Sequence, residues 1–224
     1  LEETAHPLLW WSLGDESKVI RNSLELDEGS RVLLITGPNT GGKTVLLKTI
    51  GLAGVCARNG FFFPAAQVSG RSPLILPYFD SFYIDVGDDQ SIAQHLSSFS
   101  SHILKLKMAL ERLTDLSLVL VDELNTATDP EEGGALARAF IETLLTKSKA
   151  LLIATTHDPN LKVLGTTHEQ ITVASMQFDD VHYTPTYRIL MGVPGRSRAI
   201  DTAQRLGFPK SVVEMARGFL SQEH

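Results

Sequence analysis

The sequence predicts an α/β fold with a mostly parallel central sheet, and three apolar runs among its 224 residues support that prediction. These runs occupy residues 32–35, 117–121 and 150–155. Short runs of this kind are typical of strands that are covered on both faces. A turn and then a helical pattern follow the first two runs, which is the alternation expected of parallel strands joined by helices.

The turn after residues 32–35 is rich in glycine and reads GPNTGGKT over residues 37–44. The helix predicted after it stops at Asn59-Gly60. Four apolar positions share one face of that helix: Leu46, Ile50, Ala53 and Ala57. A strand, the pattern G-x-x-x-x-G-K-T and a helix, in that order, form the context that a phosphate-binding P-loop requires.

The chemistry of this loop suits a nucleoside triphosphate. Glycines let backbone N–H groups surround phosphates, and the amino end of the next helix directs its positive dipole at the same anion. Lys43 can reach the β- and γ-phosphates, and the Thr44 hydroxyl can bind Mg²⁺. The predicted phosphate-binding residues are Gly37, Pro38, Asn39, Thr40, Gly41, Gly42, Lys43, Thr44 and Val45.

Upstream of the loop, residues 18–26 also have the composition of a strand, and the turn Asp27-Glu28-Gly29-Ser30 follows them. We therefore expect residues 18–26 and 31–36 to form an antiparallel N-terminal hairpin. Val19 and Ile20 suit either the core or a contact with the nucleotide base.

Two acids, Asp122 and Glu123, end the apolar run 117–121, where burial without a partner would be costly. This arrangement is typical of a Walker B strand, in which Asp122 orders the Mg²⁺ shell and Glu123 polarises the water that attacks the γ-phosphate. His157 follows the run 150–155 and is placed to sense the γ-phosphate at the carboxyl end of a central strand. Lys43, Glu123 and His157 are thus the predicted catalytic residues.

The other predicted elements are, in chain order, a strand at 81–86, a helix from Phe99 to Leu113, a helix capped by Asp129-Pro130, a hairpin of 171–178 with 187–191, and short helices at 198–206 and 209–220. Ser97 and Ser98 precede the helix at Phe99 and suit either an N-cap or a phosphate contact. The last helix is too apolar for reading DNA, which favours packing or dimer contact through it.

Composition limits the classes of function. The chain is 43% hydrophobic and carries a formal charge of −6, so it is a poor nucleic-acid binder on its own. A single cysteine excludes an internal disulfide, and no apolar run approaches membrane-spanning length. We expect a cytoplasmic protein without membrane contact. Because the chain starts at Leu1, we also expect a fragment of a longer protein.

Taken together, the motifs GPNTGGKT, GDDQSI, SSFSSH, LVLVDEL, TDPEEG, TTH and PTYRILMGVPGRSRA strongly resemble the ATPase domain of MutS proteins. The resemblance is to the second bacterial MutS branch, which is associated with suppressing recombination. It covers nearly the whole chain. It implies an ABC-type ATPase domain over residues 1–196, using ATP and Mg²⁺, and a helix-turn-helix-like dimerisation appendage over residues 197–224.

The resemblance also implies roles for single residues. Gln90 corresponds to the element that links the metal to helix movements, and Ser97 or its neighbour Ser98 to the signature serine that reaches the γ-phosphate of the other subunit. Tyr187 falls where a family ring stacks on the adenine. The implied assembly is a homodimer with composite sites, which contacts DNA through domains outside this chain.

The sequence departs from the family pattern at two places. Asn125 and Ala127 replace the usual glycines after Glu123, and Asp158 replaces the usual aromatic residue after His157. The mismatch-reading, clamp, coiled-coil and nuclease-like domains of the family have no counterpart in these residues.

Several functions stay open at this point. The leading hypothesis is the ATPase engine of a DNA-structure-binding protein in DNA repair or suppression of recombination. A nucleotide-gated module for stalled ribosomes or RNA is the alternative. Another ABC-type ATPase is disfavoured because L-S-G-G-Q is absent, and a GTPase because N-K-x-D is absent.

Overall fold

The computed structural model describes residues 1–65, 75–87, 98–127, 129–179, 181–182, 184–195 and 199–222. Its centre is a six-stranded sheet with the strand order β2-β3-β4-β1-β5-β6, in which only β6 runs antiparallel to its neighbour. The strands are β1 (Val32–Thr36), β2 (Ser81–Asp85), β3 (Ser117–Val121), β4 (Leu151–Thr155), β5 (Ile171–Asp179) and β6 (Thr184–Met191). The predicted α/β fold with a mostly parallel sheet is confirmed.

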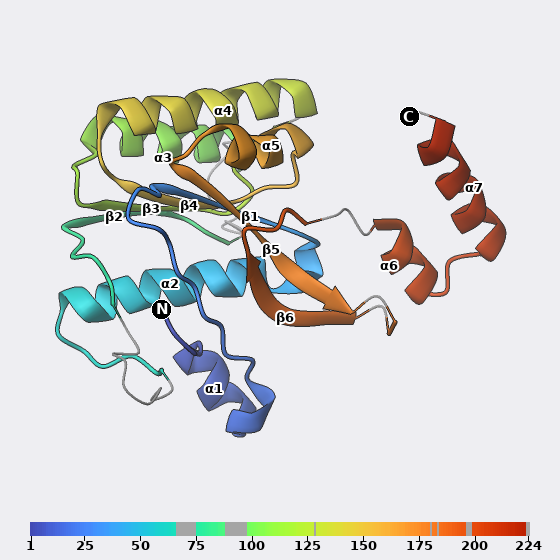
Figure 1. Ribbon diagram of the computed structural model, residues 1–224, viewed down its shortest axis with the longest axis horizontal. Helices are drawn as coiled ribbons and strands as arrows, with labels where there is room; N and C mark the ends of the chain where they lie inside the picture. The colour runs from blue at the N-terminus through green and yellow to red at the C-terminus, as the bar shows by residue number, and fades with distance from the viewer. Residues whose placement is uncertain are drawn as a thin grey trace.

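Helices cover both faces of the sheet (Figure 1). One face carries α3 (Ser98–Arg112), α4 (Pro130–Lys147) and α5 (Pro159–Thr167), and the other carries α2 (Lys43–Arg58). Successive residues of β1 therefore serve two cores: Val32 and Leu34 pack with α4 and α5, whereas Leu33 and Ile35 pack with α2. This two-sided burial is why the central strands read as unbroken apolar runs.

The expected N-terminal hairpin is wrong. Strand β1 pairs in parallel with β4 on one side and with β5 on the other, so it has no free edge for residues 18–26. Those residues form a short 3₁₀ turn, Glu16–Lys18, and then an extended segment whose bridge partner is Thr4, through Asn22. The one antiparallel pair in the described sheet is β5 with β6, as the sequence predicted for residues 171–191.

Helix boundaries follow local chemistry. The Asp129 carboxylate accepts hydrogen bonds from the N–H groups of Glu131 and Glu132, which confirms the predicted cap of α4. Helix α2 ends at Asn59 and Gly60, and Gly60 takes a positive φ of 72°. Of the apolar face predicted for α2, Ala57 is exposed, one residue before the helix ends at Arg58. An additional helix, α1 (Pro7–Leu13), lies below α2 in Figure 1.

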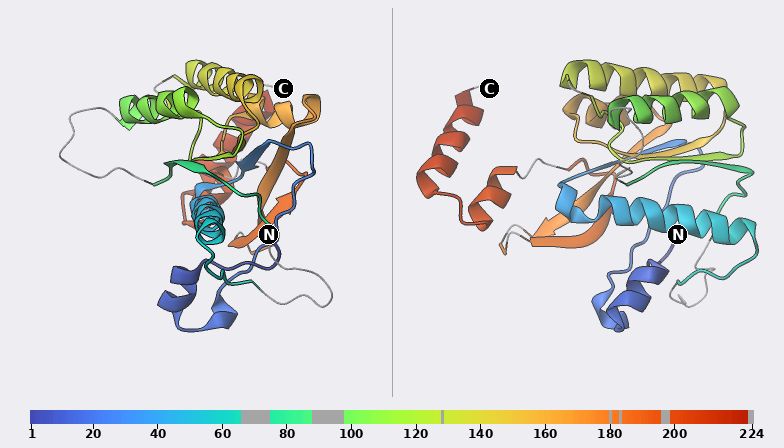
Figure 2. Two further views of the ribbon diagram at one scale, coloured as in Figure 1. Left: turned by 90° about the vertical axis from the view of Figure 1, so that its left-hand side faces the viewer. Right: turned by 180° about the vertical axis from the view of Figure 1, so that it is seen from behind.

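The chain ends in a helix pair, α6 (Ala199–Arg205) and α7 (Lys210–Gln222), that stands apart from the sheet in Figure 1 and in the right-hand view of Figure 2. Val213 is buried between the two helices, but several large apolar side chains of the pair remain exposed: Leu206, Phe208, Val212, Met215 and Phe219. Among the described residues, no helix combines the length and the apolar character that crossing a membrane requires.

An ionic cluster joins the edge strand β2 to α3. The Asp85 carboxylate lies 2.5 Å from His102 Nδ1 and 2.9 Å from Lys105 Nζ, and His102 Nε2 lies 3.4 Å from the Leu124 carbonyl. Burial alone would raise the pKa of Asp85, but the hydrogen bonds from His102 and Lys105 outweigh it and hold the pKa below its ordinary value. The cluster therefore anchors α3 beside the loop that follows β3.

We predict that Asp85→Asn lowers the free energy of unfolding by about 2 kcal/mol at about pH 7, because an amide replaces a buried charged acceptor. A carboxylate whose pKa is lowered by folding stabilises the protein above its unfolded pKa, and that contribution is lost as the pH falls through the folded pKa. Urea unfolding of both proteins should therefore show the difference shrinking toward about pH 3. Asp27→Asn, in an exposed turn, is the control. A difference that is independent of pH would contradict the prediction.

Candidate functional site

The glycine-rich loop, residues 37–44, connects the carboxyl end of β1 to the amino end of α2. Gly37 and Gly42 take φ values of 119° and 92°, a region that residues with a Cβ rarely adopt. A Cβ on Gly37 would also lie 3.3 Å from the Met176 backbone nitrogen. The loop thus needs its glycines, and helix α2 begins at Lys43 with its unpaired N–H groups and positive dipole end on the loop.

Lys43 is buried beneath this loop, with 2% of its surface exposed. Its Nζ donates to the Gly37 carbonyl at 2.7 Å and lies 3.2 Å from His157 Nε2. Burial lowers the pKa of Lys43 to about 8, although the charges of Asp122 and Glu123 act in the opposite sense. The site therefore holds a cation whose surroundings only partly compensate its charge.

Asp122 is held by hydroxyl groups from two sides. Thr44 Oγ1 donates to Asp122 Oδ2 at 2.6 Å, and Thr155 Oγ1 donates to Asp122 Oδ1 at 2.6 Å. The Thr155 oxygen in turn accepts the Glu123 N–H at 2.7 Å. Thr155 is fully buried at the end of β4 and is a functional residue that the sequence analysis missed.

Glu123 and His157 lie at the solvent side of the same group. Glu123 Oε1 is 3.9 Å from His157 Nε2, and both side chains are nearly half exposed. Glu123 adopts a positive φ of 55°, a strained backbone for a non-glycine residue, which points to a position fixed by its surroundings. Burial and then the charge of Lys43 lower the pKa of His157, so the imidazole is neutral around neutral pH.

These residues fit a magnesium ion. The Thr44 hydroxyl and the Asp122 carboxylate place two hard oxygen donors side by side. Magnesium at phosphate sites takes one or two such protein oxygens and completes its shell with phosphates and waters. In keeping with that, the described part of the chain contains no group of three or more His, Cys, Asp or Glu residues that could hold a metal alone.

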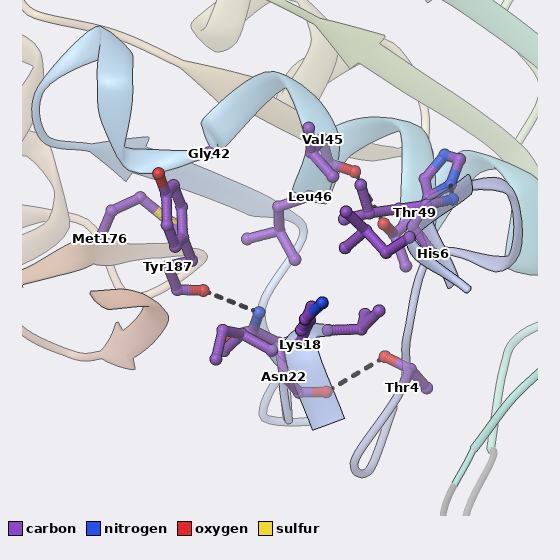
Figure 3. A pocket seen from close by; sticks show the side chains of 14 residues that line it. Thr4, His6, Lys18, Asn22, Gly42, Val45, Leu46, Thr49, Met176 and Tyr187 are labelled. Atoms are coloured by element: carbon purple, nitrogen blue, oxygen red, sulfur yellow. Dashed lines mark hydrogen bonds between the residues drawn. The ribbon is translucent and has the colours of Figure 1, made fainter. Parts of the chain in front are cut away.

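A cavity of about 350 Å³ opens beside the glycine-rich loop, between α1, α2 and the 18–22 segment (Figure 3). The Tyr187 ring forms one wall, and a Cβ on Gly42 would lie 3.2 Å from that ring. Asn22 fixes this wall because its amide group donates to the Tyr187 carbonyl at 2.9 Å and accepts the Ile189 N–H at 2.8 Å. The cavity is lined mainly by apolar side chains, including Val19 and Leu46, which suits an aromatic ring.

The structure brings together most of the predicted residues, but it does not reach all of them. Gln90 and Ser97 lie outside the described residues, as do the side chains of Asn39 and Ser98. The unusual Asn125 has a structural partner, since Thr156 Oγ1 donates to Asn125 Oδ1 at 2.9 Å. Thr155 gave no signal in the sequence, because a single threonine in a strand is common for many other reasons.

We predict that Lys43→Met raises the free energy of unfolding of the nucleotide-free protein by about 1 kcal/mol, because it replaces a desolvated charge with an apolar side chain of similar shape. ATP should raise the melting temperature of the wild-type chain but not that of the variant. Lys48→Met, on the exposed face of the same helix, is the control and should change neither quantity. A melting temperature of Lys43→Met below that of both other proteins would contradict this account of the site.

Comparison with known proteins gives two findings. The family described as MutS domain V matches residues 33–223. The chain is 48% identical over 220 residues to Endonuclease MutS2 of Thermomicrobium roseum, an alignment that covers 98% of the chain and 26% of that protein. It is 44% identical over 217 residues to Endonuclease MutS2 of Lactiplantibacillus plantarum, covering 97% of the chain and 26% of that protein. The chain thus spans about a quarter of the length of these relatives.

Proposed function

This chain belongs to the MutS family, and from that premise we propose that it is the Mg²⁺-dependent ATP-hydrolysing domain of a larger MutS2-like protein. The membership confirms the resemblance predicted from the motifs. Domain V is the ATPase domain of MutS-family proteins. The observation that carries the proposal is the convergence of Lys43, Thr44, Asp122, Glu123 and His157 at the carboxyl edge of β1, β3 and β4.

In the proposed reaction the glycine-rich loop is a P-loop that binds the triphosphate through its N–H groups and through Lys43. Mg²⁺, held by Thr44 and Asp122, would neutralise charge on the β- and γ-phosphates. Glu123 accepts a hydrogen bond from the attacking water and orients it, and the neutral His157 donates a hydrogen bond toward the γ-phosphate. The adenine base of ATP would occupy the cavity and stack against the Tyr187 ring.

The relatives carry the name endonuclease, but that name describes proteins about four times as long as this chain. We propose ATP chemistry rather than nuclease chemistry for this chain because the half-buried Asp122 and the buried Lys43 are arranged around the glycine-rich loop. An ABC-type domain over residues 1–196 and a dimerisation appendage over 197–224 extend the proposal. The exposed apolar side chains of α6 and α7 support the second part.

We further propose that the working unit is a homodimer, in which Ser97 of one subunit reaches the γ-phosphate bound by the other and Gln90 links the metal to helix movements. MutS-family proteins bind DNA and work as dimers. DNA contact, in repair or in suppression of recombination, would come from parts of the protein outside this chain. Stimulation of the full-length ATPase by branched DNA supports that role, whereas stimulation by ribosomes and not by DNA would replace it with the ribosome alternative.

We predict that Glu123→Gln lowers the rate of ATP hydrolysis by at least about 100-fold, because an amide cannot act as the base toward water. ATP binding should persist, and the variant with ATP should elute as a dimer in size-exclusion chromatography with light scattering. Glu111→Gln, in an exposed helix position, is the control and should hydrolyse ATP at the wild-type rate. A wild-type rate of hydrolysis for Glu123→Gln would refute the assignment of Glu123 as the general base.

We predict that Tyr187→Ala weakens ATP binding by about 10-fold, since stacking of a base on an aromatic ring contributes about 1–3 kcal/mol. Tyr187→Phe keeps the ring and should bind ATP as the wild type does. Calorimetric titration of ATP and of inorganic triphosphate separates the two contributions, because triphosphate binding should be unchanged in both variants. Equal weakening for triphosphate would mean that Tyr187 acts on the loop and not on the base.

A further inference from the structure

Lys162 of α5 lies next to the phosphate side of the site and has no part in the reaction described above. Its Nζ donates to the carbonyl of Gly195 at 3.1 Å. Gly195 belongs to the segment that leaves β6, turns back past the end of β1 and leads toward α6 (Figure 1). The ammonium group of Lys162 thus ties α5 to this segment.

The other side of Gly195 is fastened to the start of the glycine-rich loop. The Gly195 N–H donates to Thr36 Oγ1 at 2.7 Å, and Thr36 Oγ1 donates to the Ala174 carbonyl at 2.8 Å. Thr36 is fully buried and directly precedes Gly37. A Cβ on Gly195 would lie 3.0 Å from Thr36 Oγ1 and 3.2 Å from the Gly37 nitrogen, so this segment packs on the loop as closely as backbone allows.

These contacts continue to the buried lysine, because the Gly37 carbonyl accepts the hydrogen bond of Lys43 Nζ. A displacement of Gly37 therefore moves the group that holds Lys43. Lys162 is thus connected through Gly195, Thr36 and Gly37 to the ammonium group that would meet an incoming polyphosphate.

A simpler interpretation is a solvated lysine whose charge interacts with Asp158, one turn earlier on the same helix. That interpretation does not account for the geometry. Burial lowers the pKa of Lys162 despite the favourable charge of Asp158, and the Nζ hydrogen bond is made to a neutral carbonyl. A lysine that gives up hydration for a neutral acceptor needs another source of compensation, which bound phosphates would supply.

We propose that Lys162 is a positioning residue for the phosphates of ATP: it holds Gly195 against Thr36 and thereby fixes Gly37 and Lys43 in their binding geometry. This inference rests on the proposed ATPase function. In the proposed function, Gly37 and Lys43 contact the phosphates both before and during hydrolysis. Loss of the Lys162–Gly195 hydrogen bond would therefore weaken ground-state and transition-state binding alike. The affected constant is then KM, with kcat preserved.

The test uses the full-length protein with Lys162→Met, which keeps an unbranched apolar side chain one atom shorter but removes the charge and the donor. We expect KM and the dissociation constant for ATP to rise about 10-fold, while kcat stays within about twofold of the wild type. Lys162→Arg, which keeps both the charge and a donor, should restore most of the affinity. Lys107→Met on the exposed side of α3 is the matched control and should behave as the wild type.

Two further variants test the route through Gly195. Gly195→Ala should raise KM in the same way, since its Cβ would displace the segment from Thr36 and Gly37. The double variant, Gly195→Ala with Lys162→Met, should bind ATP as tightly as the single variant with the lower affinity. Both changes release the same contact, so their effects should not add. If Lys162→Met fails to fold, as judged by thermal unfolding, Gly195→Ala and Thr36→Val still decide the outcome.

Any of three results would overturn the inference: wild-type affinity in Lys162→Met, a fall in kcat without a change in KM, or no recovery in Lys162→Arg. If Lys162→Met does not fold, wild-type affinity in Gly195→Ala and Thr36→Val overturns it. A wild-type protein that neither binds nor hydrolyses ATP would instead refute the proposed function, so the two failures are distinguishable.

Discussion

The site depends on one topological constraint, the position of β4 between β1 and β3. Neighbouring strands are about 4.8 Å apart, so the loop after β1 and the acids after β3 are separated by about 10 Å at the edge of the sheet. Two threonine hydroxyls span that gap, one from α2 and one from the end of β4, and both donate to Asp122. The intervening strand also delivers His157 to Lys43. An order that moved β4 away from β1 and β3 would remove Thr155 and His157 from this group.

The same strand order produces a site in which several interactions are energetically unfavourable. A lysine is buried with a carbonyl and an imidazole as neighbours, a second lysine lies close enough to act on it, and Glu123 adopts a strained backbone. Such features persist when the surrounding structure holds them in place. Burial disfavours the charged form of Lys43, so a bound polyphosphate would offset a cost that the folded protein otherwise bears.

The sequence was sufficient to predict what depends on local pattern. Unbroken apolar runs identified the central strands, and residue types at fixed spacing identified the glycine-rich loop, Asp122 and His157. The order of neighbouring strands could not be predicted in this way, because long-range packing decides which strands pair. Residues 18–26 look like a strand, but β1 is already paired on both edges. Thr155, Lys162 and Gly195 have ordinary identities, and their importance comes from where the fold places them.

Two sets of contacts connect this site to elements at its periphery. On one side, the Asp85 carbonyl accepts the Asp122 N–H at 2.8 Å while the Asp85 carboxylate holds His102 of α3. On the other side, Gly195 joins the start of the glycine-rich loop to the segment that leads toward α6. Helix α3 and the segment that leads toward α6 thus lie at the outer ends of these two sets of contacts. If the proposed dimer forms through α3 or α6, these contacts would couple it to the phosphate site, and the coupling would be reciprocal. A partner subunit would then change the affinity for ATP by the same factor by which ATP changes the affinity for the partner.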